Sequence, residues 1–459
     1  MDIKELLKYQ EGKTLEFKKD LSSLKPVMKT IIAFANTAGG TILIGRDDFG
    51  HISGIENALA DEEALVNSIS DSIAPQIMPE IQFFSVEGKT LIAVNVPHLP
   101  GPFYLKTEGS ENGVYIRLGS SNRKAGAEIL AEIKRLLQNR TFDQLPCHGT
   151  NKMDLSFDLI EKTFKVVGKT IDTQNMISLG LLIQYENQII PSNGGIILFG
   201  NMDKRLEEFP DARISCALFS GVDKEVFLDK LDIEKSVLHA IDDVQKFIRR
   251  STRLLPKIEG LRRIDLPEYP IVAIREVLIN AIAHADYSLH GMRIFISVFS
   301  DRLEIQNPGI LPFGMTLDDL RAGVSKIRNR VIVRVLREQG FMEEWGSGYQ
   351  RVVQICAKNG YPEPKWLELG TAVKVVFYPH PELKRYSVVG DPANDPANDR
   401  QQWFIDQLST GKNKKAVDIM QFWNVSEKTA KRDIAFLRRA GLIGYSGSTK
   451  TGQYFIIKK

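Results

Sequence analysis

A short direct repeat predicts a boundary between domains in this chain of 459 residues. The tetrapeptide Asp-Pro-Ala-Asn occurs twice in succession within residues 390–400. Proline lacks the backbone N–H that helices and sheets need, and Asp and Asn favour turns, so we expect a linker at 389–400. A second boundary is expected after a helical pattern that ends near residue 138. We therefore predict an α+β multidomain protein with domains at 1–145, 146–388 and 401–459.

Helical and strand patterns alternate through the first 388 residues. Gly-Gly after an apolar-periodic stretch predicts a helix that ends near Gly39, and longer patterns predict helices at 237–253 and 271–284. Short β-rich runs bounded by turn residues predict strands. The expected strands are 41–45, 90–96, 113–119, 194–200, 212–221, 293–299 and 302–307.

The composition is that of an ordinary globular protein, with 43% hydrophobic and 25% charged residues. The three cysteines, Cys147, Cys216 and Cys356, are far apart, which argues against a zinc site and favours a reducing compartment. The N-terminus lacks an apolar signal core, and no run of about 18 apolar residues is present. We expect a soluble, cytoplasmic protein with no membrane contact.

The last sixty residues concentrate positive charge. Residues 400–459 hold twelve Lys or Arg and four Asp or Glu, a net charge of +8 in a chain whose total is +3. Helical patterns there precede two short strands joined by a glycine-containing turn, and the last helix places Ala430, Ile434 and Leu437 on one face. This order predicts a winged helix-turn-helix.

A basic recognition helix suits the major groove of double-stranded DNA, because Arg and Lys reach base edges and phosphates. The alternative is a solvated charged helix in a protein-interaction module. The candidate DNA-binding residues are Lys428, Lys431, Arg432, Arg438 and Arg439.

The segment EGKTLEFKKD at 11–20, followed by AFANTAGGTILIGRDDFGHISG at 33–54, resembles the Schlafen-type AlbA-like domain. The resemblance covers about residues 5–140 and implies nucleic-acid binding. Some members of that family use a metal-dependent ribonuclease site of three acidic residues, and Glu11, Glu16 and Asp48 match these by position.

Carboxylate oxygens are ligands that Mg²⁺ or Mn²⁺ prefers, and such a metal activates water at a phosphate. The alternative is that Glu16 and Asp48 are structural. The expected backbone contacts of this domain are Lys18, Lys19, Arg46 and Arg123.

The helix at 271–284 carries Glu276, Asn280 and His284 at i, i+4 and i+8, hence on one face. Together with NPG at 307–309 and WGSGYQR at 345–351, it resembles the GHKL-type ATPase fold, an α/β sandwich. That resemblance implies that Glu276 acts as general base, that Asn280 binds Mg²⁺, and that ATP is the ligand. The nucleotide-binding residues would be Asn280, Asn307, Gly309, Gly346 and Gly348.

One departure from that family concerns the adenine-reading residue. The family has an Asp in a DxGxG box, whereas this chain has Asn307 followed by Pro308 and Gly309. An amide can still hydrogen-bond adenine, but the proline changes the pocket. Downstream, Ser325, Lys326, Arg328 and Arg330 could hold phosphates or pack as a lid. The alternative is a degenerate fold that keeps the helix face for packing.

The whole arrangement resembles a bacterial transcriptional-regulator family that is often labelled RecG-like ATP-dependent helicase. No GxxxxGK[ST] phosphate loop is present, so the helicase label finds no support in the sequence. We expect a DNA-binding regulator with an ATP-binding sensor domain. The alternative is a metal-dependent nuclease acting on RNA or DNA, in phage defence for example. The oligomeric state stays open, although a homo-oligomer would match two DNA half-sites.

Overall fold

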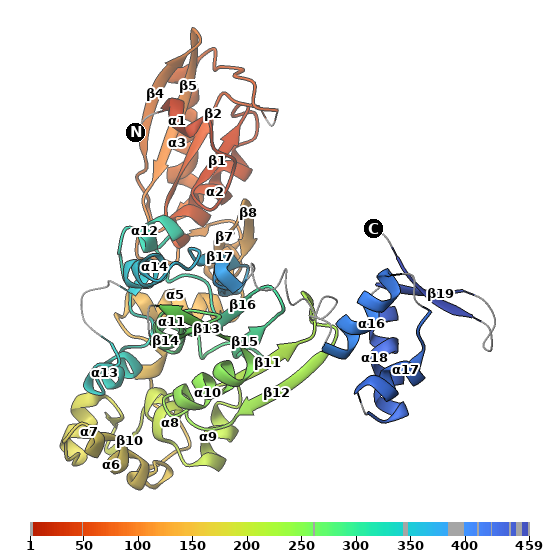
Figure 1. The fold of residues 1–459 in the computed structure, drawn as a ribbon. Helices are drawn as coiled ribbons and strands as arrows, with labels where there is room; N and C mark the ends of the chain where they lie inside the picture. Colours follow the sequence, from red (N-terminus) through yellow and green to blue (C-terminus); the bar gives the residue numbers. More distant parts are fainter. Residues whose placement is uncertain are drawn as a thin grey trace. The chain divides into compact units, whose positions relative to one another are not determined.

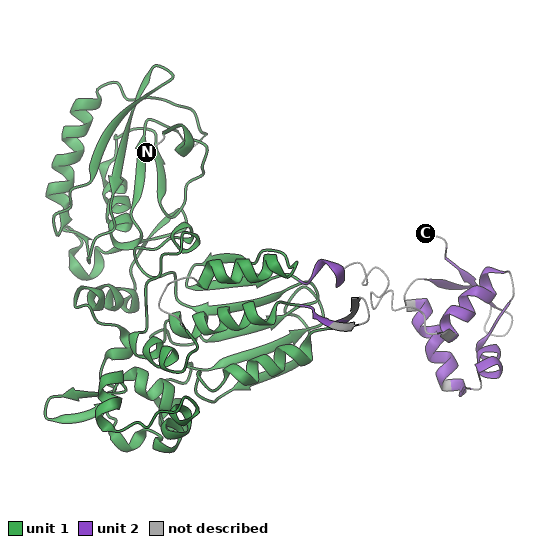
Figure 2. Cartoon of the chain, turned by 60° about the vertical axis from the view of Figure 1, so that its left-hand side comes forward, with its two compact units in different colours: residues 1–253, 269–378 green, residues 254–268, 379–459 purple. Residues whose placement is uncertain are grey.

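The computed structural model describes residues 3–47, 49–259, 262–342, 348–383, 399–410, 413–423, 425–439, 442–446 and 452–457. Asp48, Gly346 and most of the predicted linker at 389–400 lie outside these residues. The chain forms two compact units, residues 1–253 with 269–378 and residues 254–268 with 379–459 (Figure 2). The domain boundaries expected from the sequence stay predictions.

A four-stranded sheet forms the centre of the N-terminal region, with strand order β1-β2-β5-β4 (Figure 1). Strands β1 and β2 run parallel, and the other neighbours are antiparallel. One face packs on α2 and α3 through a large apolar core, and the other packs on α1. The elements are α1 (Ile3–Leu6), β1 (Leu15–Lys18), α2 (Leu24–Thr37), β2 (Gly40–Ile44), α3 (Ala58–Ser72), β4 (Glu80–Val86) and β5 (Lys89–Val96).

Shorter elements complete this region. Strand β7 lies against α2, and the hairpin of β7 and β8 closes one end of the core. They are β3 (Ile73–Ala74), β6 (Tyr104–Leu105), α4 (Gly109–Asn112), β7 (Tyr115–Leu118), β8 (Ser121–Lys124) and α5 (Ala127–Leu137).

A six-stranded mixed sheet dominates the following region, with strand order β12-β11-β15-β16-β18-β17. Only the β11–β15 pair is parallel. Helices α10, α11 and α14 pack beside one another, and α10 and α11 contact the sheet (Figure 1). The bounds are β11 (Ile214–Phe219), β12 (Phe227–Ile233), α10 (Ile241–Ser251), α11 (Ile271–His284), β15 (Ile294–Val298), β16 (Leu303–Pro308), α14 (Gly348–Lys358), β17 (Lys365–Leu369) and β18 (Ala372–Phe377).

Short helices and hairpins make up the other described elements between residues 142 and 338. Most of the helix and strand positions predicted from the sequence are confirmed, including the helix at 271–284. The remaining elements are two 3-10 turns (Phe142–Gln144 and Lys152–Asp154), α6 (Phe157–Val166), α7 (Thr173–Leu179), β9 (Leu182–Tyr185), β10 (Gln188–Pro191), α8 (Asn193–Phe199), α9 (Met202–Glu208), β13 (Leu254–Glu259), β14 (Arg262–Pro267), α12 (Leu317–Arg321) and α13 (Arg330–Glu338).

The strand predicted at 194–200 is wrong, because these residues form helix α8. Ser192 caps the helix by accepting a hydrogen bond from the backbone N–H of Gly195 at 2.9 Å. Every residue of α8 is buried, so its apolar run shows no amphipathic periodicity. Such a run does not distinguish a buried helix from a buried strand.

The C-terminal segment folds as three helices followed by a two-stranded antiparallel sheet. Its core contains Phe404, Ile419, Ile434 and Leu437. The elements are α16 (Asp399–Ser409), α17 (Ala416–Trp423), α18 (Glu427–Arg439), β19 (Ile443–Ser446) and β20 (Gln453–Ile456). None of the described helices combines the length and apolar character needed to cross a lipid bilayer.

Candidate functional site

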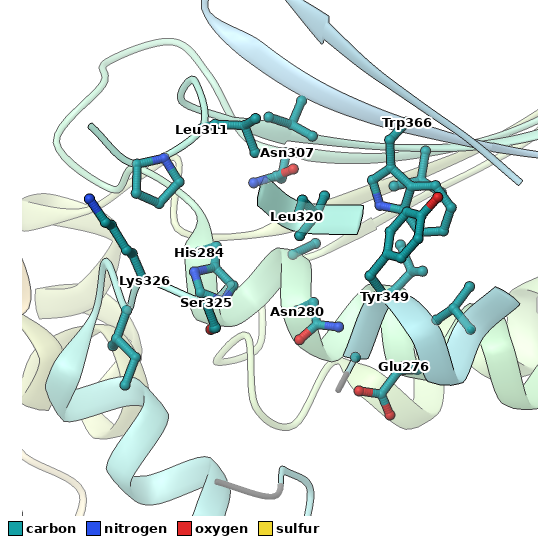
Figure 3. A pocket seen from close by; sticks show the side chains of 18 of the residues that line it. Glu276, Asn280, His284, Asn307, Leu311, Leu320, Ser325, Lys326, Tyr349 and Trp366 are labelled. Atoms are coloured by element: carbon teal, nitrogen blue, oxygen red, sulfur yellow. The ribbon is translucent and has the colours of Figure 1, made fainter. Parts of the chain in front are cut away.

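Helix α11 presents its polar residues to a cavity of about 240 Å³. Most of the helix is apolar and buried, which anchors it against the sheet and its neighbouring helices. Glu276, Asn280 and His284 recur every four residues and line the cavity together (Figure 3). The structure therefore brings the residues of the predicted helix face to one hollow.

The other walls of this cavity come from distant parts of the sequence. Asn307 at the end of β16 lies across from α11, and Tyr349 of α14 and Trp366 of β17 close one side (Figure 3). The rings of Tyr349 and Trp366 have centroids 4.5 Å apart. Sequence reasoning missed this aromatic pair, because the two residues are 17 positions apart in the sequence and no motif joins them.

Gly348 allows the start of α14 to approach α11 closely. A Cβ atom at this position would lie 2.9 Å from Asn280 Nδ2 and 3.4 Å from Glu276 Oε1. Such a contact would displace the amide, so this glycine keeps backbone N–H groups near the two polar side chains. The predicted partner Gly346 lies outside the described residues.

The carboxylate of Glu276 is only 14% exposed, and the Arg351 guanidinium lies near it. Arg351 places Nη1 4.0 Å from Glu276 Oε2, and its side chain is 49% exposed. Lys326 and Ser325 line the opposite end of the cavity (Figure 3).

His284 ends α11 with a neutral imidazole. Burial, with a smaller contribution from the Arg328 guanidinium, lowers the pKa of His284 to about 4. The buried Asn329 side chain donates to the carbonyls of Ala283 and Ala285 at 3.0 and 2.7 Å, and so holds the end of the helix. His284 therefore acts as a neutral hydrogen-bonding group at neutral pH.

Gly309, one of the predicted nucleotide-binding residues, does not line the cavity. Its φ is +98°, and a Cβ there would lie 2.3 Å from Arg328 Nη1. Arg328 itself pairs with Glu132 at 3.2 Å, and Arg330 donates to the Asn139 carbonyl at 2.8 Å. Of the four candidate phosphate or lid residues, the structure directs only Ser325 and Lys326 to the cavity.

The loop after β16 connects this cavity wall to the N-terminal region. The carboxylate of Glu368 accepts hydrogen bonds from Lys13 Nζ at 2.8 and 2.9 Å and from the backbone N–H of Leu311 at 3.1 Å. The N–H of Gly314 donates to the Thr37 carbonyl. Ile310 and Phe313 pack in one apolar cluster with residues of β7 and α5. No sequence motif signals these contacts.

The N-terminal carboxylates have different surroundings. Glu16 is 6% exposed, and its two oxygens bind Lys18 Nζ and Arg117 Nη2. Arg117 is 1% exposed and also donates to the Gly12 carbonyl and the Asn122 side chain, at 3.0 and 2.9 Å.

Glu11 accepts a hydrogen bond from the Phe17 backbone N–H at 2.9 Å. The third predicted acid, Asp48, lies outside the described residues. Within the described ranges, no group of three or more His, Cys, Asp or Glu could hold a metal ion.

Helix α18 carries exposed Lys and Arg side chains. Lys431 pairs with Glu427 at 2.7 Å while both stay exposed, and Arg432 and Arg438 are exposed. Asp433 is buried and binds Arg400 at 2.8 Å, which ties α18 to α16. Lys428 and Arg439 belong to α18, but their side chains lie outside the described part of the chain.

Comparison with known families gives two matches. Residues 11–126 match the family described as Schlafen, AlbA_2. This match includes all four strands of the N-terminal sheet. Residues 291–377 match the family described as Putative ATP-dependent DNA helicase recG C-terminal, an ATPase-like domain. This second match includes Asn307 and the Tyr349–Trp366 pair, whereas α11 precedes it.

Solved structures that resemble the chain include the following two. The crystal structure of the DIP2311 protein from Corynebacterium diphtheriae is 19% identical, covers 99% of this chain and 96% of that one, and has a TM-score of 0.45. The solution structure of the N-terminal domain of a putative ATP-dependent DNA helicase RecG-related protein from Nitrosomonas europaea is 31% identical. It covers 27% of this chain and 92% of that chain, with a TM-score of 0.22. No curated protein matches the chain.

The two family matches agree on a broad class. An AlbA_2 domain and a RecG-like ATPase-like domain suggest a nucleic-acid-related protein with a capacity for nucleotide and Mg²⁺ use. Mg²⁺ is usually held by one or two protein carboxylates together with phosphate oxygens and water, and the Glu276 carboxylate lines the cavity beside the Asn280 amide. A cage of several protein carboxylates is not required.

Proposed function

We propose that this protein is a DNA-binding regulator whose middle region binds ATP with Mg²⁺ and acts as a sensor. The observation that carries the proposal is the convergence of Glu276, Asn280, Asn307 and Gly348 on one cavity. These residues come from two helices and a strand, and the sequence motifs that contain them lie up to 72 residues apart. Convergence of separate polar motifs on an apolar-lined hollow is typical of a ligand site.

Each residue has a chemical role in the proposed site. The Asn280 side-chain oxygen would bind Mg²⁺, which neutralises phosphate charge, and the Glu276 carboxylate would orient water. Backbone N–H groups near Gly348 would approach phosphate oxygens, and the Asn307 amide would hydrogen-bond the base. Pro308 follows Asn307 directly and forms the last residue of β16, so it restricts the backbone at the base-binding end.

The C-terminal segment would read the DNA. Three helices and a two-stranded sheet are the order expected of a winged helix-turn-helix, with α18 as the recognition helix. The exposed Lys431, Arg432 and Arg438 support this role, with Lys428 and Arg439 as further candidates on the same helix. The Lys431–Glu427 pair is exposed and hence weak, so it leaves the lysine available to phosphate.

A thermal-shift measurement tests the nucleotide site. At about 100 times its dissociation constant, ATP with Mg²⁺ should stabilise the protein by about 2.7 kcal/mol. Asn280→Ala should abolish this shift, because the metal loses its protein oxygen. Asn67→Ala, which makes the same change on the exposed face of α3, should keep it. If no adenine nucleotide shifts the wild-type midpoint, the sensor role is wrong.

A metal-dependent nuclease is the second candidate, built on Glu11, Glu16 and Asp48. Its weak point is Glu16, which is already bound by Arg117 and Lys18. Incubation of labelled RNA and DNA with Mn²⁺ separates the candidates. Cleavage that disappears in Glu16→Gln, a variant that keeps the side-chain size, would favour the nuclease. Binding without cleavage in both proteins would favour the regulator.

A further inference from the structure

A second hollow, of about 310 Å³, lies between α2 and β8 in the AlbA_2 domain. Its lining includes Lys25 and Lys29 from the first turns of α2, and Asn122 from β8. These lysines are four residues apart, so they lie on one face of the helix. We name this feature the lysine groove.

The floor of the lysine groove contains a neutralised carboxylate. Glu16 lines the hollow, and its oxygens bind Lys18 and the buried Arg117. Asn122 accepts a hydrogen bond from Arg117 at 2.9 Å and donates one to the Thr30 hydroxyl at 2.8 Å. The floor is therefore a fixed polar network in which the two cations outweigh the single negative charge.

The rim of the lysine groove carries further positive charge. Lys29 and Lys124 share one carboxylate, Glu108, at 3.7 and 2.8 Å. Lys124 shares a strand face with Asn122, because alternate residues of a strand point the same way. Lys25 is exposed and has no carboxylate partner among the described residues. Five cations thus surround two carboxylates, Glu16 and Glu108.

We propose that the lysine groove binds the phosphodiester backbone of a nucleic acid. This inference rests on the proposed nucleic-acid-binding function and assigns it a location. Lysine ammonium groups act as mobile point charges that suit phosphate, and Ser and Asn side chains such as Ser23 and Asn122 add neutral contacts. No aromatic side chain lines the hollow among the described residues, so the groove would contact the backbone and read no base.

This assignment gives Glu16 a role different from that of a metal ligand. Its carboxylate holds Lys18 and Arg117 in place under the groove, so it acts as a positioning residue for phosphate contacts. A bound phosphate would lie over a site whose negative charge is already compensated, which removes the repulsion that a free carboxylate would cause.

The test is nucleic-acid affinity of the full chain measured by fluorescence anisotropy over a range of salt. The probes are duplex DNA and duplex RNA of one sequence. The variant is Lys25→Ala with Lys29→Ala. Loss of two phosphate contacts should lower the slope of log affinity against log salt by about 1.8 for DNA. Between 50 and 200 mM salt, the wild type should therefore lose about tenfold more affinity than the variant.

Two control proteins make the result specific. Lys162→Ala with Lys165→Ala removes the same charge from exposed positions of α6 and should leave the slope unchanged. Lys25→Arg with Lys29→Arg keeps the charge and should retain the affinity. The groove variant is also made in a full chain that carries Lys431→Ala, Arg432→Ala and Arg438→Ala, so that the C-terminal contribution cannot mask it.

The outcomes separate this inference from the function on which it rests. If the wild type binds neither probe, the proposed function is wrong. If the wild type binds but the groove variant matches it in both backgrounds, only the lysine groove is wrong. A reduced salt slope with DNA alone, with RNA alone or with both supports the groove and identifies the polymer whose backbone it binds.

Discussion

Glu276 and Glu16, which the sequence predicts as candidate catalytic residues, have opposite surroundings in this protein. Glu276 lies on a helix face, is 14% exposed and lines a cavity beside Asn280 and Gly348. Glu16 lies on a strand, is 6% exposed and is bound by two cations. One carboxylate is presented to a ligand-sized space, and the other is committed to the fold.

The difference follows from what surrounds each carboxylate. Asn280 lies four residues from Glu276 on the same helix face, and the half-exposed Arg351 places Nη1 4.0 Å from the Glu276 carboxylate. Glu16 meets Arg117, which is 101 residues distant and almost fully buried. A buried charge is tolerated only with a partner, so the two side chains stabilise each other and neither is available for chemistry.

The largest expected effect tests the structural role of Glu16. Arg117→Ala should lower the free energy of unfolding by about 3–5 kcal/mol, because it removes the buried partner of the Glu16 carboxylate and leaves the more exposed Lys18 to compensate its charge. Chemical denaturation measures this. Lys134→Ala, which breaks an exposed pair with Glu111, should cost less than about 1 kcal/mol. If Arg117→Ala is equally mild, Glu16 is not committed to the fold and the comparison fails.

The next effect concerns pH and the end of the helix that carries Glu276. The pKa of His284 is about 4 in the folded protein against 6.5 in the unfolded chain. As pH falls from about 6.5 to 4, the unfolded chain takes up a proton that the folded protein refuses, so stability is lost. The difference corresponds to about 3 kcal/mol.

Unfolding measured at several pH values checks this expectation. His284→Gln cannot take up a proton, so its stability should decline less over that range by about the same amount. Parallel pH profiles for the two proteins would mean that His284 titrates normally and that this end of the cavity is open to water.

A slightly smaller effect tests the close approach at Gly348. Gly348→Ala should remove most of the roughly 2.7 kcal/mol of stabilisation by saturating ATP with Mg²⁺, because the new methyl group displaces Asn280. Gly221→Ala serves as control, since only an Asp223 oxygen at 4.0 Å lies near its added Cβ. An unchanged shift in Gly348→Ala would show that ligand does not use this end of the cavity.

The smallest effect concerns the link between the cavity wall and the N-terminal region. Lys13→Met removes an ion pair whose side chains are 17% and 18% exposed, and should lower the free energy of unfolding by about 1 kcal/mol.

Glu368→Gln should weaken nucleotide affinity a few-fold, because the contact of Glu368 with the Leu311 N–H holds the cavity wall. Isothermal titration measures the second effect. Equal affinities in wild type and Glu368→Gln would mean that the wall holds its position without this contact.

Sequence reasoning succeeded where a pattern repeats within one element. The helix at 271–284 was predicted with its observed bounds, because its apolar residues and its polar residues at i, i+4 and i+8 follow the helical period. The strand predicted at 194–200 was wrong, since an apolar run in a fully buried element has no periodicity to distinguish helix from strand. The Tyr349–Trp366 pair and the Glu368 contacts could not be predicted, because they join residues without a shared motif.

By itself, the amino-acid sequence determined that the chain is a multidomain α+β protein. It also determined that polar residues share one face of the otherwise apolar helix at 271–284, and that positive charge accumulates in the last sixty residues. Only the tertiary structure decided which acids are available to a ligand. Local periodicity sets the face on which a side chain lies, but burial and charge pairing depend on residues brought from far along the chain. Arg117, which is 101 residues away in the sequence, binds the Glu16 carboxylate in this way, whereas the Glu276 carboxylate lines the cavity.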